Sequence, residues 1–172
     1  MKWLRSSLPV LSVALLTLAA ALPWGLAAED RFVLPLLPVI AIYHWTLDPD
    51  AWLPDWAIFL AGLTLDVLTQ GPLGYWALVY LCAYAVAMLV SRRPAASALG
   101  RMGMLAVALV AVTGFAWLLA SLYFLQLLRW QPYAWSAFVT IILAFALTPF
   151  LGITWSGAKS AARGMRLTRG SQ

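Results

Sequence analysis

Five long stretches without a charged side chain limit what this chain can fold into. They contain no Asp, Glu, Lys or Arg and comprise residues 6–28, 32–47, 67–91, 102–128 and 130–158. A membrane-spanning helix needs about 20 mainly apolar residues, each rising ~1.5 Å. Four of the five stretches are long enough for one full span, and residues 32–47 are short. Because only 10% of the residues are charged, against roughly 25% in soluble domains, we predict an all-α integral membrane protein.

A sixth candidate span, residues 52–69, is apolar apart from Asp55 and Asp66. The chain is therefore predicted to form a six-helix transmembrane bundle followed by a basic tail at residues 157–172. The predicted spans lie at about residues 8–28, 32–47, 52–69, 74–90, 104–128 and 133–155. The first segment also has the features of a secretory signal, with a possible cleavage site at Gly25-Leu26-Ala27. Its long apolar run favours a retained span, and cleavage would leave five spans.

The basic residues predict how these spans are oriented, because short cytoplasmic loops retain an excess of Lys and Arg. With both termini inside, nine of the eleven basic residues are cytoplasmic, and Arg31 and Arg129 face outward. The predicted cytoplasmic residues are Lys2, Arg5, Arg92, Arg93, Arg101, Lys159, Arg163, Arg166 and Arg169. The net charge of +5 thus indicates topology and attraction to anionic lipid headgroups, and we expect no nucleic-acid binding.

The chain offers little chemistry for catalysis or for cofactor binding. It has no glycine-rich phosphate loop, no nucleophile elbow, no H-E-x-x-H motif and no Cys/His ligand cluster. Cys82 is the single cysteine and is expected to be a packing residue. His44, the single histidine, lies at a predicted membrane edge, where a structural role is favoured over catalysis. We expect no enzyme activity, no metal site and no cofactor.

Asp66 is a lone carboxylate within a predicted span, which by default makes it a candidate for ion, proton or ligand contact. It lies one helical turn after Gly62, so both residues share a face that another helix can approach closely. It also precedes a tight turn at residues 70–74. The free amides near Gly74 and Tyr75, at the start of the next helix, would attract a carboxylate. We favour a structural staple between the third and fourth spans over ligand or proton chemistry.

The segment around Asp66 resembles the core signature of the rod shape-determining protein MreD family. That signature is G-L-x-x-D, which begins here at Gly62, followed by a P-L-G turn that ends at Gly74. The resemblance covers mainly residues 32–93 and includes the six-span layout. It assigns a structural or partner-binding role to Gly62, Asp66, Gly71, Pro72 and Gly74.

The resemblance implies a non-enzymatic, multi-pass subunit of the bacterial inner (cytoplasmic) membrane. Such a subunit belongs to the cell-elongation machinery and helps to organise peptidoglycan synthesis and cell shape. Its implied partners are MreC, the MreB filament, and the RodA glycosyltransferase with its transpeptidase. The sequence suits this role, because short loops leave helix faces, a basic cytoplasmic rim and small outer turns as the surfaces for contact.

The alternative from another class is the substrate-binding membrane subunit of a vitamin transporter, since the MreD fold is thought to be similar to that of these S-components. Such subunits often contact their energy-coupling partner through an A-x-x-x-A motif in the first span. Here that spacing is absent from the first span and is found at Ala83/Ala87 and Ala116/Ala120. Few polar side chains are available to line a binding cavity, so we favour the elongation subunit.

Overall fold

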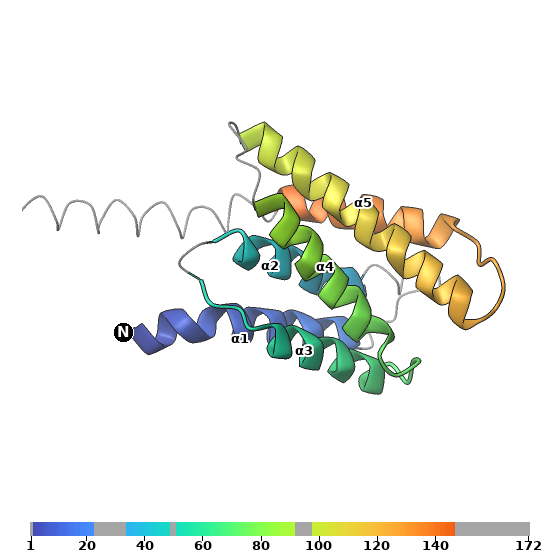
Figure 1. The fold of residues 1–172 in the computed structure, drawn as a ribbon, viewed down its shortest axis with the longest axis horizontal. Coiled ribbons are helices and arrows are strands. Elements are labelled where there is room, and N and C mark those ends of the chain that lie inside the picture. Colours follow the sequence, from blue (N-terminus) through green and yellow to red (C-terminus); the bar gives the residue numbers. More distant parts are fainter. Residues whose placement is uncertain (1, 23–33, 49–50, 92–97, 147–172) are drawn as a thin grey trace, which may run out of the picture. The chain divides into compact units, whose positions relative to one another are not determined.

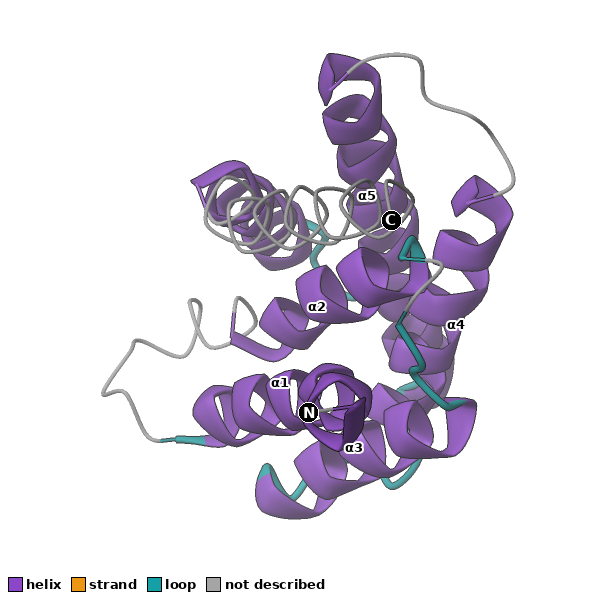
Figure 2. Ribbon diagram, turned by 90° about the vertical axis from the view of Figure 1, so that its left-hand side faces the viewer, coloured by secondary structure: helices purple, strands orange, loops and turns teal. Residues whose placement is uncertain are grey.

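The computed structural model describes residues 2–22, 34–48, 51–91 and 98–146, and all regular structure in these ranges is helical (Figures 1 and 2). The elements in chain order are α1 (Lys2–Ala21), the 3₁₀ turn η1 (Leu34–Leu36), α2 (Leu37–Thr46), α3 (Asp55–Leu68), α4 (Tyr75–Ser91), α5 (Ala98–Tyr123) and a last helix, Gln131–Ala146. The chain divides into two compact units, Met1–Ile141 and Ile142–Gln172. All contacts discussed below lie within the first unit.

The prediction of an all-helical chain is confirmed for the described residues, and each predicted span contains a helix. Several boundaries differ from the prediction. Helix α1 starts at Lys2 instead of residue 8, and α5 starts at Ala98, so that Arg101 lies in a helix and not in a loop. The sequence predicts a later start for α5 because the residues before 104 include polar and small ones typical of a loop, although Ala98 and Leu99 are strong helix formers.

Part of the sequence prediction lies outside the described residues. This applies to the ends of the first and last predicted spans, at residues 23–28 and 147–155, and to the basic tail. It also applies to the predicted cytoplasmic residues Arg92, Arg93, Lys159, Arg163, Arg166 and Arg169.

Helix α3 begins and α5 ends for local backbone reasons. Pro54 is the residue before α3 and has extended backbone angles (φ −74°, ψ 142°), which delay the helix from the predicted residue 52 to Asp55. Helix α5 stops at Tyr123, five residues before the predicted end. There the amide of Gln126 donates to the carbonyl of Ser121 (3.1 Å) and that of Leu125 to Leu122 (3.2 Å). This pair of bonds is a Schellman motif, which closes a helix.

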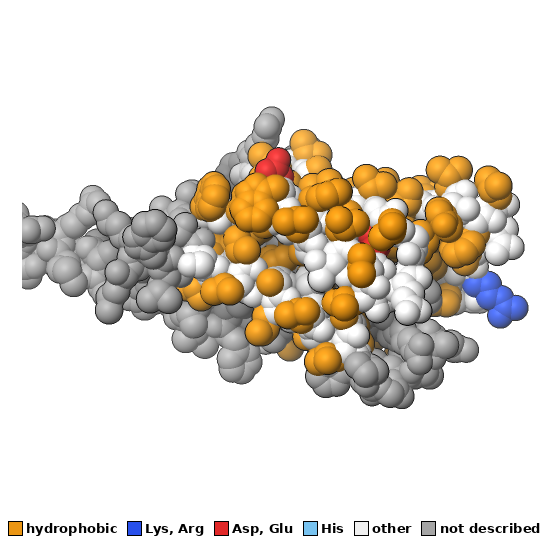
Figure 3. All heavy atoms as spheres, turned by 90° about the horizontal axis from the view of Figure 1, so that it is seen from below, with side chains coloured by type: hydrophobic (Ala, Val, Ile, Leu, Met, Phe, Trp, Pro, Cys, Tyr) orange, Lys and Arg blue, Asp and Glu red, His pale blue; other side chains and the backbone are white. Residues whose placement is uncertain are grey.

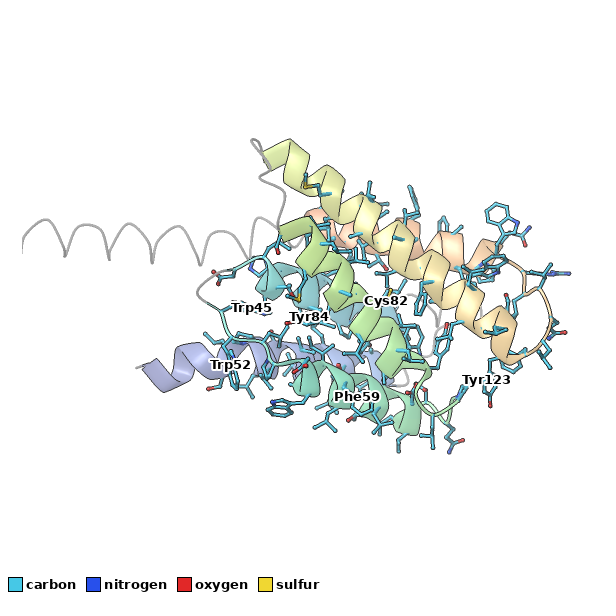
Figure 4. The ribbon with its side chains drawn as sticks, in the orientation of Figure 1. Trp45, Trp52, Phe59, Cys82, Tyr84 and Tyr123 are labelled. Carbon is cyan, nitrogen blue, oxygen red and sulfur yellow. The ribbon has the colours of Figure 1, made fainter. Side chains whose placement is uncertain are left out.

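Helix α4 is central to the packing of the first unit: it lies against α2, α3 and α5, while α1 packs on α2 and α3. The core is made of aliphatic and aromatic side chains that include Ile42, Ile58, Leu65, Val79 and Tyr80. Many large apolar side chains are also exposed, and on the face seen in Figure 3 hydrophobic side chains cover much of the described surface. Phe59, for example, projects from α3 away from the bundle (Figure 4).

Among the described residues, one helical segment, Met102–Tyr123, is long and apolar enough to cross a membrane. Four other apolar helices are shorter: Ser7–Ala21, Leu34–Thr46, Tyr75–Ser91 and Gln131–Ala146. Helix α3 has 14 residues, which corresponds to a length of about 21 Å. The helices at the second and third predicted spans are thus shorter than the ~30 Å hydrocarbon core of a bilayer.

Candidate functional site

The α3–α4 hairpin contains the residues that the sequence analysis singled out. Helix α3 ends in a Schellman motif, in which the amide of Gly71 donates to the carbonyl of Asp66 (3.0 Å) and that of Gln70 to Val67 (3.3 Å). The chain then turns, and the amide of Tyr75 donates to the carbonyl of Pro72 (3.1 Å). Helix α4 starts when the amide of Leu78 donates to Gly74 (2.9 Å). The hairpin is therefore closed by bonds within the chain.

Positive φ angles in this turn occur at Gln70 (53°) and Gly74 (92°), and not at Gly71. Gly71 therefore does not take the positive φ that glycine allows. The reason is that the position after the helix cap in a Schellman motif, which is usually glycine, is occupied here by Gln70. At Gly74 the backbone does require glycine, since L side chains rarely adopt φ near 92°.

The Asp66 carboxylate is fully buried and bonds with both oxygens to the start of α4. Its Oδ2 accepts from the backbone amide of Gly74 (2.8 Å) and its Oδ1 from that of Trp76 (2.8 Å). Amides in the first turn of a helix have no intrahelical acceptor, and the positive end of the helix dipole favours an anion there. The expected staple contact is therefore present. The second donor is Trp76 and not Tyr75, because the Tyr75 amide is used by the turn.

Gly62 is the point of closest approach between α3 and α4. A Cβ atom at this position would lie 2.5 Å from the backbone nitrogen of Ala77 and 2.7 Å from the carbonyl carbon of Trp76. Since real Cβ atoms essentially never come this close, only glycine fits without a shift of one helix. Gly62 and Asp66 thus act on the same segment of α4. Gly62 lets the two helices approach closely, and the Asp66 carboxylate then accepts hydrogen bonds from backbone amides at the start of α4.

The predicted hairpin residues do not contribute equally. Gly62, Asp66 and Gly74 are brought together, and Pro72 supplies a carbonyl to the turn. Gly71 has room for a side chain, because a Cβ there would meet only the Thr69 hydroxyl at 3.4 Å.

Three side-chain bonds that the sequence analysis missed hold neighbouring elements together. The Tyr80 hydroxyl, fully buried, donates to the carbonyl of Pro35 (2.8 Å), and the Tyr75 hydroxyl donates to Ala116 in α5 (3.0 Å). The indole of Trp45 donates to the Ser12 hydroxyl in α1 (2.7 Å). A signal was available, because a buried Tyr hydroxyl or Trp N–H usually needs a partner. The sequence alone does not name that partner.

The acceptor for Tyr80 follows from the prolines that precede α2. In the 3₁₀ turn Leu34–Leu36, the carbonyl of Pro35 would bond to the amide three residues later. That residue is Pro38, which has no N–H. The Tyr80 hydroxyl supplies the donor instead, and this links α4 to the start of α2.

His44 and Cys82, the single histidine and the single cysteine, are both half-buried. The His44 ring is half-buried and packs edge-on against Trp45 at 5.3 Å between ring centroids. Cys82 is a half-buried free thiol. Within the described ranges, no group of three or more His, Cys, Asp or Glu side chains could hold a metal ion.

Three buried hydroxyl groups in the described part of the chain have no hydrogen-bond partner: Tyr43, Ser136 and Thr140. By contrast, five threonines donate to the carbonyl four residues earlier in their own helices, at 2.6–2.8 Å: Thr17, Thr46, Thr64, Thr69 and Thr113. Such back-bonding satisfies a hydroxyl within an apolar helix. Ser136 and Thr140 are one helical turn apart, so their helix carries two neighbouring buried hydroxyls without such a hydrogen bond.

Comparisons of the chain with protein-family models, with curated proteins and with solved structures give no match.

Proposed function

We propose that this chain is a non-enzymatic, multi-pass subunit of the bacterial cytoplasmic membrane that holds partner helices in the cell-elongation complex. The α3–α4 hairpin is the observation that carries the proposal. The residues that resemble the MreD signature are engaged with backbone: Asp66 uses both oxygens on α4 amides, and Gly62 contacts Ala77. They form a structural hairpin, which suits a scaffold better than a reaction centre.

The outward helix faces support a scaffold, because they are apolar over long distances. On α1 and at the residue directly after it, leucines recur at alternating spacings of three and four residues and are 50–70% exposed: Leu8, Leu11, Leu15, Leu18 and Leu22. This is the a/d pattern with which one helix packs along another. A partner with a single transmembrane helix, as MreC is implied to have, would fit such a seam.

The membrane location in this proposal rests on the apolar surface and on the helix Met102–Tyr123. The shorter helices α2 and α3 would be accommodated because the bilayer can thin locally and tryptophans can anchor helix ends. Trp52, three residues before α3, and Trp56, in its first turn, are both exposed and occupy positions where such anchors are expected.

The proposal is tested by recovering the complex from native membranes. The tagged wild-type chain is expected to retain MreC after detergent extraction, whereas a chain with Leu11→Asn and Leu15→Asn should lose it. The matched control replaces two other exposed residues outside the seam, Leu78→Asn and Leu89→Asn. Equal retention of MreC by both variants would exclude the α1 seam, and its absence from the wild-type preparation would contradict the proposal.

The vitamin-transport subunit is a second candidate, favoured by the unpartnered buried hydroxyls of Tyr43, Ser136 and Thr140. Buried polar groups without partners are costly, and a polar ligand could satisfy them. Mass spectrometry of the purified protein distinguishes the two functions, since a vitamin retained at near one equivalent would support transport over the elongation role.

A further inference from the structure

The turn between α5 and the helix Gln131–Ala146 exposes large apolar side chains. Leu125 is 88% exposed and Leu127 85%, and the other apolar side chains exposed at this turn are Leu122, Tyr123, Phe124 and Trp130. Tyr123 lies at the end of α5 in Figure 4. A connecting loop in water is usually polar, whereas Gln126 and Arg129 are the polar residues between Phe124 and Trp130.

The backbone of this turn is closed on itself. The amides of Phe124, Leu125 and Gln126 donate to carbonyls of the last turn of α5, at 3.0–3.2 Å. The amide of Leu128 donates to the Ser121 hydroxyl (3.3 Å), and its carbonyl accepts from the indole of Trp117 (3.0 Å). Four backbone amides of the turn are thereby satisfied within the chain, while its large apolar side chains are exposed.

Leu125 is doubly unfavourable for a turn in water. It occupies the position of the Schellman motif where glycine is usual, with φ of 52°, and an L side chain is strained there. It is also the most exposed of the large apolar side chains in the described residues. A medium that removes this side chain from water would account for a leucine at this position.

We infer that the turn at residues 123–130 inserts its apolar side chains into the lipid bilayer, at the boundary between headgroups and acyl chains on the outer side. The inference rests on the proposed membrane location. The turn directly follows Met102–Tyr123, whose 22 residues extend about 33 Å, close to the ~30 Å hydrocarbon core, so the turn falls at the interface. Irregular backbone is not stable in the hydrocarbon itself, which places the turn at the boundary.

The residues at the end of the turn indicate that lipid, and not another protein, contacts this surface. Trp130 and Arg129 are exposed side by side in sequence. Trp side chains prefer the headgroup level, and Arg can extend to phosphate groups while its stem stays among the acyl chains. The exposed surface of the turn therefore combines apolar side chains with one aromatic and one basic residue suited to the interface.

The α3–α4 turn provides a matched control at the same end of the first unit (Figure 1). Gln70 and Leu125 occupy the same position of the same motif, with φ of 53° and 52°, and both are exposed. They differ in that one side chain is polar and the other apolar. If the inference holds, a probe at residue 125 is in lipid and a probe at residue 70 is in water.

The experiment uses single-cysteine chains on a Cys82→Ser background, with Leu125→Cys, Leu127→Cys or Gln70→Cys labelled by an environment-sensitive fluorophore. The labelled chains are reconstituted into phosphatidylethanolamine–phosphatidylglycerol vesicles. Quenching is measured with aqueous iodide, equilibrated across the membrane, and with nitroxide attached near the lipid headgroup. We expect the iodide quenching constant at residues 125 and 127 to be at least threefold lower than at residue 70, with the reverse order for the nitroxide.

Equal iodide access at residues 70 and 125 would overturn the inference, and so would a probe at 125 and 127 that neither quencher reaches, since protein would then cover the turn. If the chain enters vesicles and still binds MreC, but iodide reaches the probe at residue 125, the insertion of the turn is wrong and the proposed function is unaffected. A chain that cannot be reconstituted into vesicles would overturn the proposed function as well.

Discussion

Replacing Gly62 by alanine adds one methyl group at the closest contact between α3 and α4. The added Cβ would start 2.5 Å from the Ala77 nitrogen, so the helices must separate by about 1 Å before the contact becomes tolerable. The two Asp66 bonds, each 2.8 Å long, would then exceed hydrogen-bonding distance.

The expected loss of stability combines two effects. Overpacking costs roughly 1–3 kcal/mol, and a buried polar group that loses its partners costs about 1–3 kcal/mol. Part of the second cost is avoided if the helices separate only at one end, so we expect a total of about 3 kcal/mol, or roughly a hundredfold in the unfolding equilibrium.

The measurement is reversible unfolding in micelles, followed by tryptophan fluorescence or by a steric-trap assay. Gly114→Ala is the control, because a Cβ at Gly114 meets nothing within 4 Å. This variant lies in α5 and should gain up to about 1 kcal/mol from helix propensity. If Gly62→Ala unfolds at the same denaturant concentration as Gly114→Ala, the close-contact account of the hairpin is refuted.

Further predictions concern the staple, the helix ends and the buried tyrosine. Asp66→Asn should lower stability by about 1–3 kcal/mol in the same unfolding assay, because one of the two backbone amides would face an N–H₂ group. The staple role would be excluded if this variant kept normal stability and partner binding but lost an ion- or pH-dependent activity. Gln70→Gly should stabilise the chain by about 1 kcal/mol, since glycine adopts φ near 53° without strain, and an unchanged or lower stability would argue against strain at this position. Tyr80→Phe leaves the Pro35 carbonyl without its donor and should cost about 1 kcal/mol, whereas no change in unfolding would show that this bond contributes little.

The geometry of the hairpin could be predicted in part because its causes are local. A glycine and a carboxylate one turn apart, followed by a short turn, place the carboxylate beside the start of the next helix. The exact donors could not be predicted, because the turn itself consumes the Tyr75 amide and leaves that of Trp76. The bond from Tyr80 to Pro35 joins residues 45 positions apart, and sequence spacing carries no information on such a contact.

The end of α5 was harder to predict for a different reason, whereas α3 ends at Leu68, one residue from its predicted end at residue 69. Both α3 and α5 end in Schellman motifs without glycine at the position of positive φ, where Gln70 and Leu125 stand instead. Glycine at this position is the sequence signal that usually marks the end of a helix. For α5 the sequence therefore predicts an end at residue 128, within a turn whose apolar composition resembles that of a helix.

Membrane crossing stays a prediction for most of the chain. One described helix segment meets the criteria of length and hydropathy, and the other apolar helices have 10–17 residues. Partner binding and the role in elongation likewise stay proposals, supported by the resemblance around Asp66 and by the apolar outward faces.

The central claim, that this chain organises the elongation complex, is tested most directly by cell shape after its depletion in the native bacterium. We predict that rod-shaped cells become round, that vitamin supplementation does not prevent this, and that re-expression of Gly114→Ala restores the rods while Gly62→Ala restores them poorly. Cells that stay rod-shaped after depletion, or that require a vitamin for growth, would contradict the account.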